Sequence, residues 1–123
     1  MAKTIISPFV DGDTVTGVNL SRLPDDRQKW QVITASETTE SGVFLMCNTT
    51  SAAITVTLPA SPSDGDIVGI SDGLGTAGTN TITVGRNSST IMNVAEDMVI
   101  STNNASILLT YVSTLTDWRI SAI

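Results

Sequence analysis

Three glycines, Gly73, Gly75 and Gly78, have the G-x-G-x-x-G spacing of a dinucleotide-binding turn. Such a turn holds a pyrophosphate with the free N–H groups and the positive end of a helix that begins inside the motif. The residues from Thr79 to Val84 instead alternate between polar and apolar types and are mostly β-branched, which predicts a strand. The acidic ribose ligand expected about 20 residues further on is also missing, because Asn93 stands there. We therefore expect a loop between two strands, with no nucleotide or other cofactor.

Residues that could carry out catalysis are scarce. The chain has no histidine, which removes Ser-His-Asp and Cys-His catalysis and the commonest zinc ligand. The single cysteine, Cys47, ends an apolar run and has no basic neighbour in sequence, which predicts a buried core thiol rather than a nucleophile. We therefore expect no enzymatic activity.

Carboxylates gather in two D-G-D triplets, residues 11–13 and 64–66, and Asp72 follows the second triplet. Calcium favours oxygen ligands from loops of this kind, but the further acidic residues of an EF-hand are absent. Asp-Gly is also the ordinary chemistry of a turn. We expect plain turns and no metal, and a Ca²⁺ ion near Asp64, Asp66 and Asp72 stays open as the alternative.

The charge balance excludes two classes of partner. The formal net charge is −6, with only six lysines and arginines in 123 residues. Nucleic-acid binding needs several cations to neutralise phosphates, and an anionic membrane surface attracts the same groups. The sequence also has neither a signal-peptide pattern nor a run of 18 apolar residues, which predicts a protein made in the cytoplasm.

Period-two alternation and turn clusters predict an all-β domain over residues 29–123. Eight strands are expected: Trp30–Thr34, Gly42–Cys47, Ala53–Leu58, Asp66–Ile70, Asn80–Val84, Met98–Ser101, Ser106–Val112 and Asp117–Ile120. One apolar and one polar face indicate an antiparallel β-sandwich with jelly-roll-like topology, and the lack of a fixed repeat argues against a β-solenoid. The expected core comprises Ile54, Val56, Leu58, Ile70, Ile82, Val84, Ile107, Leu109 and Trp118.

Residues 1–28 differ from the rest, because prolines and glycines interrupt short apolar pieces. We expect an extended N-terminal arm, in which residues 24–28 form either one helical turn or a solvated loop. The pieces Ile5-Ile6 and Phe9-Val10 are too short to build a core of their own. Laid along another chain they could add a strand to its edge, and the alternative is that the arm completes its own sheet.

Two aromatic residues near the C-terminus, Tyr111 and Trp118, are expected on neighbouring strands. The simpler interpretation is that they close one end of the core. The alternative is contact with a partner, because tyrosine and tryptophan are common interface anchors.

The segments ITVTLPASPSDGDIVGISDGLGTAGTNTITVGRN, IMNVAEDMVIST and NASILLTYVSTLTDWRI occur in this order along the chain. As an ordered set they resemble a module of tailed-bacteriophage virion proteins, which occurs in tail fibres, head fibres and small capsid-associated proteins. The resemblance covers residues 52–121. It implies a structural role in the virion, often as a homotrimer, and its motifs include no catalytic residue.

Three functions follow as expectations. The first is a trimeric capsid decoration, or cement, protein that binds the major capsid protein or other virion proteins on the outside of a phage head. A short acidic chain with an extended arm favours it. The second is a head- or tail-fibre module that binds a host surface, although no heptad or repeat predicts a rod. The third, an appendage enzyme, is disfavoured by the missing histidine.

Overall fold

The computed structural model describes residues 29–122, which form ten β-strands and no helix. The expectation of an all-β fold is therefore confirmed. The described range contains no helix with the length and apolarity of a membrane span. The expected arm and its residues 24–28 lie outside the described part of the chain.

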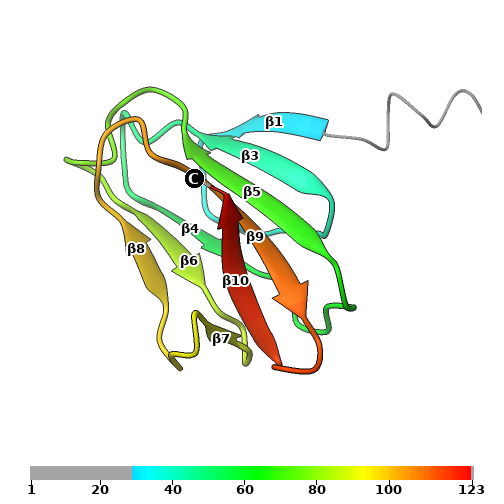
Figure 1. Ribbon diagram of the computed structural model, residues 1–123. Helices are drawn as coiled ribbons and strands as arrows, with labels where there is room; N and C mark the ends of the chain where they lie inside the picture. Colours follow the sequence, from blue (N-terminus) through cyan, green and yellow to red (C-terminus); the bar gives the residue numbers. More distant parts are fainter. Residues whose placement is uncertain (1–28, 123) are drawn as a thin grey trace, which may run out of the picture.

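The strands form two sheets (Figure 1). In spatial order, the six-stranded sheet contains β1 (Lys29–Ile33), β3 (Val43–Cys47), β5 (Ile67–Asp72), β9 (Ser106–Val112), β10 (Asp117–Ala122) and β7 (Thr90–Ile91). The four-stranded sheet contains β2 (Glu37–Thr38), β4 (Ile54–Thr57), β6 (Ile82–Gly85) and β8 (Met98–Ile100). All eight expected strands are present, and the two-residue strands β2 and β7 are additional.

From β1 to β8 the chain passes from one sheet to the other at every step. Each return to the same sheet over β1–β6 places the new strand parallel to the previous one, as in β1–β3–β5 and β2–β4–β6. Over β1–β6 the chain therefore winds around the core like a coil, with one strand in each sheet per turn. Its turns differ in length, since Trp30 lies opposite Phe44 while Phe44 lies opposite Gly69. Because the turns of this coil differ in length, the sequence shows no fixed repeat even though successive strands of each sheet are parallel.

The strand pairing departs from the antiparallel expectation. Among the eight strand pairs of residues 29–122, five are parallel and three are antiparallel. An antiparallel, jelly-roll-like topology is therefore not confirmed, and both sheets are mixed. Alternating side chains report which face of a strand is buried, but they do not report the direction of its neighbours.

One hydrophobic core lies between the two sheets. In β4, Ile54 and Val56 are buried while Thr55 is exposed, which is the alternation read from the sequence. Eight of the nine expected core residues are fully buried, and Ile107 is partly buried against the same cluster. The aliphatic side chains of both sheets thus position the loops at the two ends of the domain.

Candidate functional site

The glycine-rich loop follows β5 and is organised by the carboxylate of Asp72. The backbone N–H groups of Gly75 and Thr76 donate to Asp72 Oδ1 at 3.1 and 3.2 Å, and that of Ala77 donates to Oδ2 at 3.0 Å. The N–H of Asn104, from the loop before β9, donates to Oδ2 at 2.8 Å. The donors that would hold a phosphate in a nucleotide-binding turn are thus occupied by a carboxylate of the chain itself.

The hydrogen bonds also set the protonation state of Asp72. Burial alone would raise the pKa of this carboxyl, but the N–H donors from Asn104, Ala77, Thr76 and Gly75 outweigh it and hold the pKa below its ordinary value. Asp72 is therefore a charged structural group whose hydrogen bonds connect the loop after β5 with the loop before β9.

Two of the three glycines are needed for close contact with the loop before β9. Gly75 has a φ of 75°, and a Cβ there would lie 2.9 Å from Asn104 Oδ1. A Cβ on Gly78 would lie 2.8 Å from Asn103 Oδ1, which accepts the Gly78 N–H. The strand β6 begins at Ile82, as the alternation after Gly78 predicts. The motif is a packed junction of two loops.

The second D-G-D triplet also belongs to turns. Asp64 Oδ1 accepts the Ser113 N–H at 2.8 Å, and Asp66 Oδ2 accepts the Ser63 N–H at 2.8 Å. Together with Asp72 they occupy three separate hydrogen-bond networks. Residues 29–122 contain no group of three or more metal-ligating side chains placed to hold an ion. Turn formation therefore accounts for these carboxylates.

Cys47 is buried in the core, as expected. Burial raises the pKa of its thiol to about 11, with smaller contributions from the negative charges of Asp72 and Glu37. At neutral pH the thiol is protonated and unsuited to nucleophilic attack.

Tyr111 and Trp118 form a buried pair on β9 and β10. Their ring centroids lie 5.3 Å apart, and the exposed fractions are 7% and 0%. The structure thus favours their interpretation as core residues, and a partner contact through these side chains is not supported.

The buried carboxylate of Asp117 lies next to this pair. It accepts hydrogen bonds from the Thr90 hydroxyl at 2.5 Å, from the Asn93 N–H at 2.9 Å and from the Arg119 guanidinium at 3.0 Å. Burial would raise the pKa of Asp117, but these donors and the Arg119 charge lower it. The bond to Asn93 fixes a turn in which Met92 and Asn93 have φ values of 52° and 68°, a strained region for residues with side chains.

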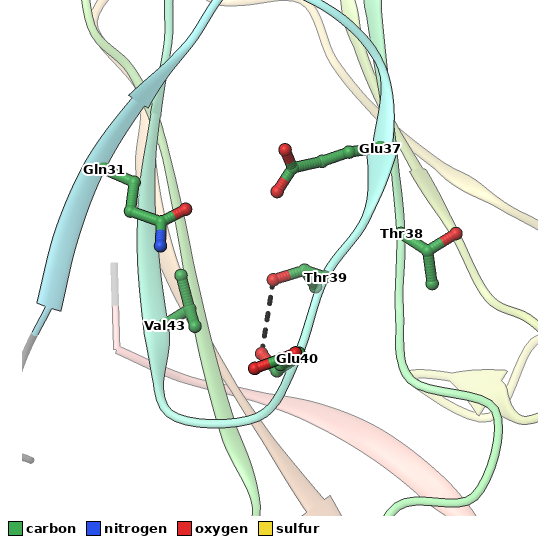
Figure 2. Close-up of a pocket in the computed structure, with 6 residues that line it drawn as sticks. All are labelled: Gln31, Glu37, Thr38, Thr39, Glu40 and Val43. Atoms are coloured by element: carbon green, nitrogen blue, oxygen red, sulfur yellow. Dashed lines mark hydrogen bonds between the residues drawn. The ribbon is translucent and has the colours of Figure 1, made fainter.

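A polar pocket of about 230 Å³ opens between β1 and the segment that contains β2 (Figure 2). The amide of Gln31 and the carboxylate of Glu37 point into the same space, whereas Thr38 points away. The Thr39 hydroxyl donates to the Glu40 carbonyl at 3.2 Å. Both glutamates are exposed, so the pocket has none of the burial that shapes a catalytic carboxylate pair.

An apolar groove of about 210 Å³ lies on the side of the six-stranded sheet that faces away from the core. We call it the outer groove, and we define it by one register row across five strands: Trp30, Phe44, Gly69, Leu108 and Ala122. Trp30 meets Phe44 edge-on, with ring centroids 4.8 Å apart and an interplanar angle of 65°.

Gly69 shapes the floor of the outer groove. The Phe44 ring lies over this glycine, and a Cβ at position 69 would come within 2.6 Å of Phe44 Cδ2. Trp30 remains 51% exposed, and the neighbouring Val32 is 68% exposed. Among the described residues, the outer groove is thus bordered by exposed apolar side chains.

The sequence did not single out Trp30, Phe44 or Gly69 as site residues. The sequence predicted strands over Trp30–Thr34 and Gly42–Cys47, but the contact between Trp30 and Phe44 depends on a parallel register that no local pattern reveals. The expected interaction residues Ile5, Ile6, Phe9 and Val10 lie outside the described residues.

A comparison with protein-family models finds no match, and a comparison with curated proteins finds no similar sequence.

Proposed function

We propose that this chain is a structural protein of a bacteriophage virion, and most specifically a homotrimeric decoration protein on the outside of the head. Its partners are then two further copies of the chain and the major capsid protein or another virion protein. The two-layer arrangement of the sheets supports a β-sandwich module within such an assembly.

The outer groove is the observation that carries the proposal. It places aromatic and aliphatic surface on a face that the domain's own core does not cover. The same sheet also ends in β1, which within residues 29–122 pairs only with β3 and so offers backbone donors and acceptors along its other edge. An apolar face beside an open strand edge is suited to contact with a second protein chain.

The buried polar groups support a structural role rather than catalysis. Asp72 and Asp117 are engaged by backbone and side-chain donors that hold loops in place. Cys47 is buried and protonated. The chemical groups singled out in residues 29–122 therefore have structural explanations, and the first D-G-D triplet, residues 11–13, lies outside the described part of the chain. The assignment to a virion draws on the ordered motifs of residues 52–121.

Two measurements test the proposal. Analytical ultracentrifugation of the full chain at micromolar concentration should give a trimer, and a monomer would contradict the oligomeric part. Cryo-electron microscopy of virions with and without the protein should show density lost from the head surface. Density lost from a fibre instead would establish the alternative of a fibre module, and unchanged virions would overturn both.

A further inference from the structure

The outer groove is lined by apolar residues and can accept apolar side chains. Phe44, Gly69 and Leu108 lie opposite one another on β3, β5 and β9, and the Phe44 ring lies over Gly69, so this ring and Leu108 form the apolar floor of the groove. Trp30 closes one end of the row, and Ala122 leaves the other end open. A segment that fills the groove therefore needs one or two large apolar side chains.

The chain carries such a segment outside the described residues. Residues 5–10 read Ile-Ile-Ser-Pro-Phe-Val, with two apolar pairs separated by a serine and a proline. Proline has no N–H to leave unpaired, which suits a backbone crossing the face of a sheet rather than joining its ladder. Burying a side chain of this size contributes about 1.5–3 kcal/mol, which helps to offset the entropy cost of ordering the segment.

The length of the connection allows the segment to reach the groove of a neighbouring copy. Eighteen residues, 11–28, separate Val10 from the start of β1. Fully extended they span about 60 Å. Crossing the chain's own groove from β1 to β10 covers four strand spacings, about 19 Å. A compact domain of this size has a radius of gyration of about 12 Å. The connection is therefore much longer than its own groove requires, and long enough to reach a neighbouring copy.

We infer that residues 5–10 of one copy occupy the outer groove of a neighbouring copy, with Phe9 against Trp30 and Phe44. The inference rests on the trimer of the proposed function. Three such exchanges close a ring in which every groove is filled and every copy is held by two others, as a heterologous interface with threefold symmetry requires.

Disulfide trapping in the full chain tests this arrangement. With Phe9 against Trp30 and Phe44, residue 5 of an extended segment lies about 13 Å further along. Ala122 is three strand spacings, about 14 Å, from Phe44, so the double variant Ile5→Cys with Ala122→Cys brings the two thiols together at the open end of the groove. Cys47 is too buried to compete. Under mild oxidation we expect species of two and three times the chain mass on non-reducing gels, and reductant should return them to the monomer. A matched control, Ile5→Cys with Thr55→Cys, puts the second thiol on an exposed position of the other sheet and should give little cross-linking.

The outcomes separate the inference from the proposed function. A disulfide within one chain, or equal cross-linking in the control, would overturn the inference while a trimer in the ultracentrifuge left the proposed function standing. A monomer in the ultracentrifuge would overturn the inference and the oligomeric part of the proposed function, and the virion role would still be decided by cryo-electron microscopy.

Tryptophan quenching gives a second readout that does not depend on new cysteines. Trp118 is fully buried, so acrylamide reports mainly on Trp30. Deletion of residues 2–12, or the single change Phe9→Asp, should increase the quenching constant at least twofold, whereas Phe9→Leu should leave it nearly unchanged. Equal quenching in all four proteins would contradict occupation of the groove.

Discussion

Residues 29–122 contain two aromatic pairs, one on each side of the six-stranded sheet. Tyr111 and Trp118 lie inside, 7% and 0% exposed, and pack into the core. Trp30 and Phe44 lie outside, with Trp30 51% exposed over a groove. Similar contacts between rings thus serve different purposes, because burial decides whether an aromatic pair stabilises the fold or remains available to a partner. The sequence favoured the C-terminal pair as core residues, with a partner contact as the alternative, and it did not single out Trp30 and Phe44, whose surface the structure leaves partly exposed.

The largest expected difference between the pairs is in stability. Trp118→Ala should lower the free energy of unfolding by about 3–5 kcal/mol, because it empties a fully buried site. The matched change Trp30→Ala should cost about 1 kcal/mol, mainly through its contact with Phe44. Urea denaturation followed by circular dichroism measures both. Equal losses would show that the two pairs do not differ as described.

The buried carboxylate of Asp117, next to Trp118 in the sequence, should also contribute to stability. Asp117→Asn places an amide donor opposite the Arg119 guanidinium, and the free energy of unfolding should fall by about 1–3 kcal/mol. As a control, Asp64→Asn changes an exposed carboxylate that accepts one backbone N–H, and its cost should be smaller. If both variants melted alike, the Asp117 network would have no special role near Trp118.

Acid should lower the free energy of unfolding through the carboxylates of Asp72 and Asp117. The folded-state pKa values of Asp72 and Asp117 are lowered, so their stabilisation is fully present above the unfolded value of about 3.9. It is lost as the pH falls through the lower folded values, because protonation then favours the unfolded chain. Melting temperatures measured from pH 7 to pH 2 should decline below about pH 4. The decline should be shallower in Asp117→Asn, and a parallel decline would exclude Asp117 as a source.

The smallest expected effect concerns the outer side. Gly69→Ala forces the Phe44 ring to move, and we expect a cost of about 1 kcal/mol together with a changed groove. Combining it with Phe44→Val makes room for the new methyl group, so the double variant should lose less than the sum of the single changes. Thermal denaturation of the four proteins in this cycle gives the coupling, and strict additivity would contradict the contact.

Sequence patterns captured the parts of this fold that depend on local chemistry. The period-two alternation of residues 53–58 predicted both the strand and its buried face, and the β-branched run after Gly78 excluded a nucleotide-binding helix. Strand direction and register could not be read in the same way, because they depend on loops of unequal length. The outer groove exists only through that register, which aligns Trp30, Phe44 and Gly69 from three separate segments. The predicted strand ended at Ile70, whereas β5 continues to Asp72, and the hydrogen bond from Asn104 to Asp72 across 32 residues could not be read from the sequence.

The alternating path of the chain between the two sheets has a consequence for how the protein folds. In the described residues, β9 and β10 are the only strands adjacent in sequence that also pair with each other. In every other pair, at least one strand of the opposite sheet lies between the two partners in sequence. Contacts between residues far apart in the sequence therefore dominate. Topologies with high contact order fold in milliseconds to seconds rather than microseconds. The β9–β10 hairpin, with the Tyr111–Trp118 contact inside it, is the most local strand pairing of the described residues.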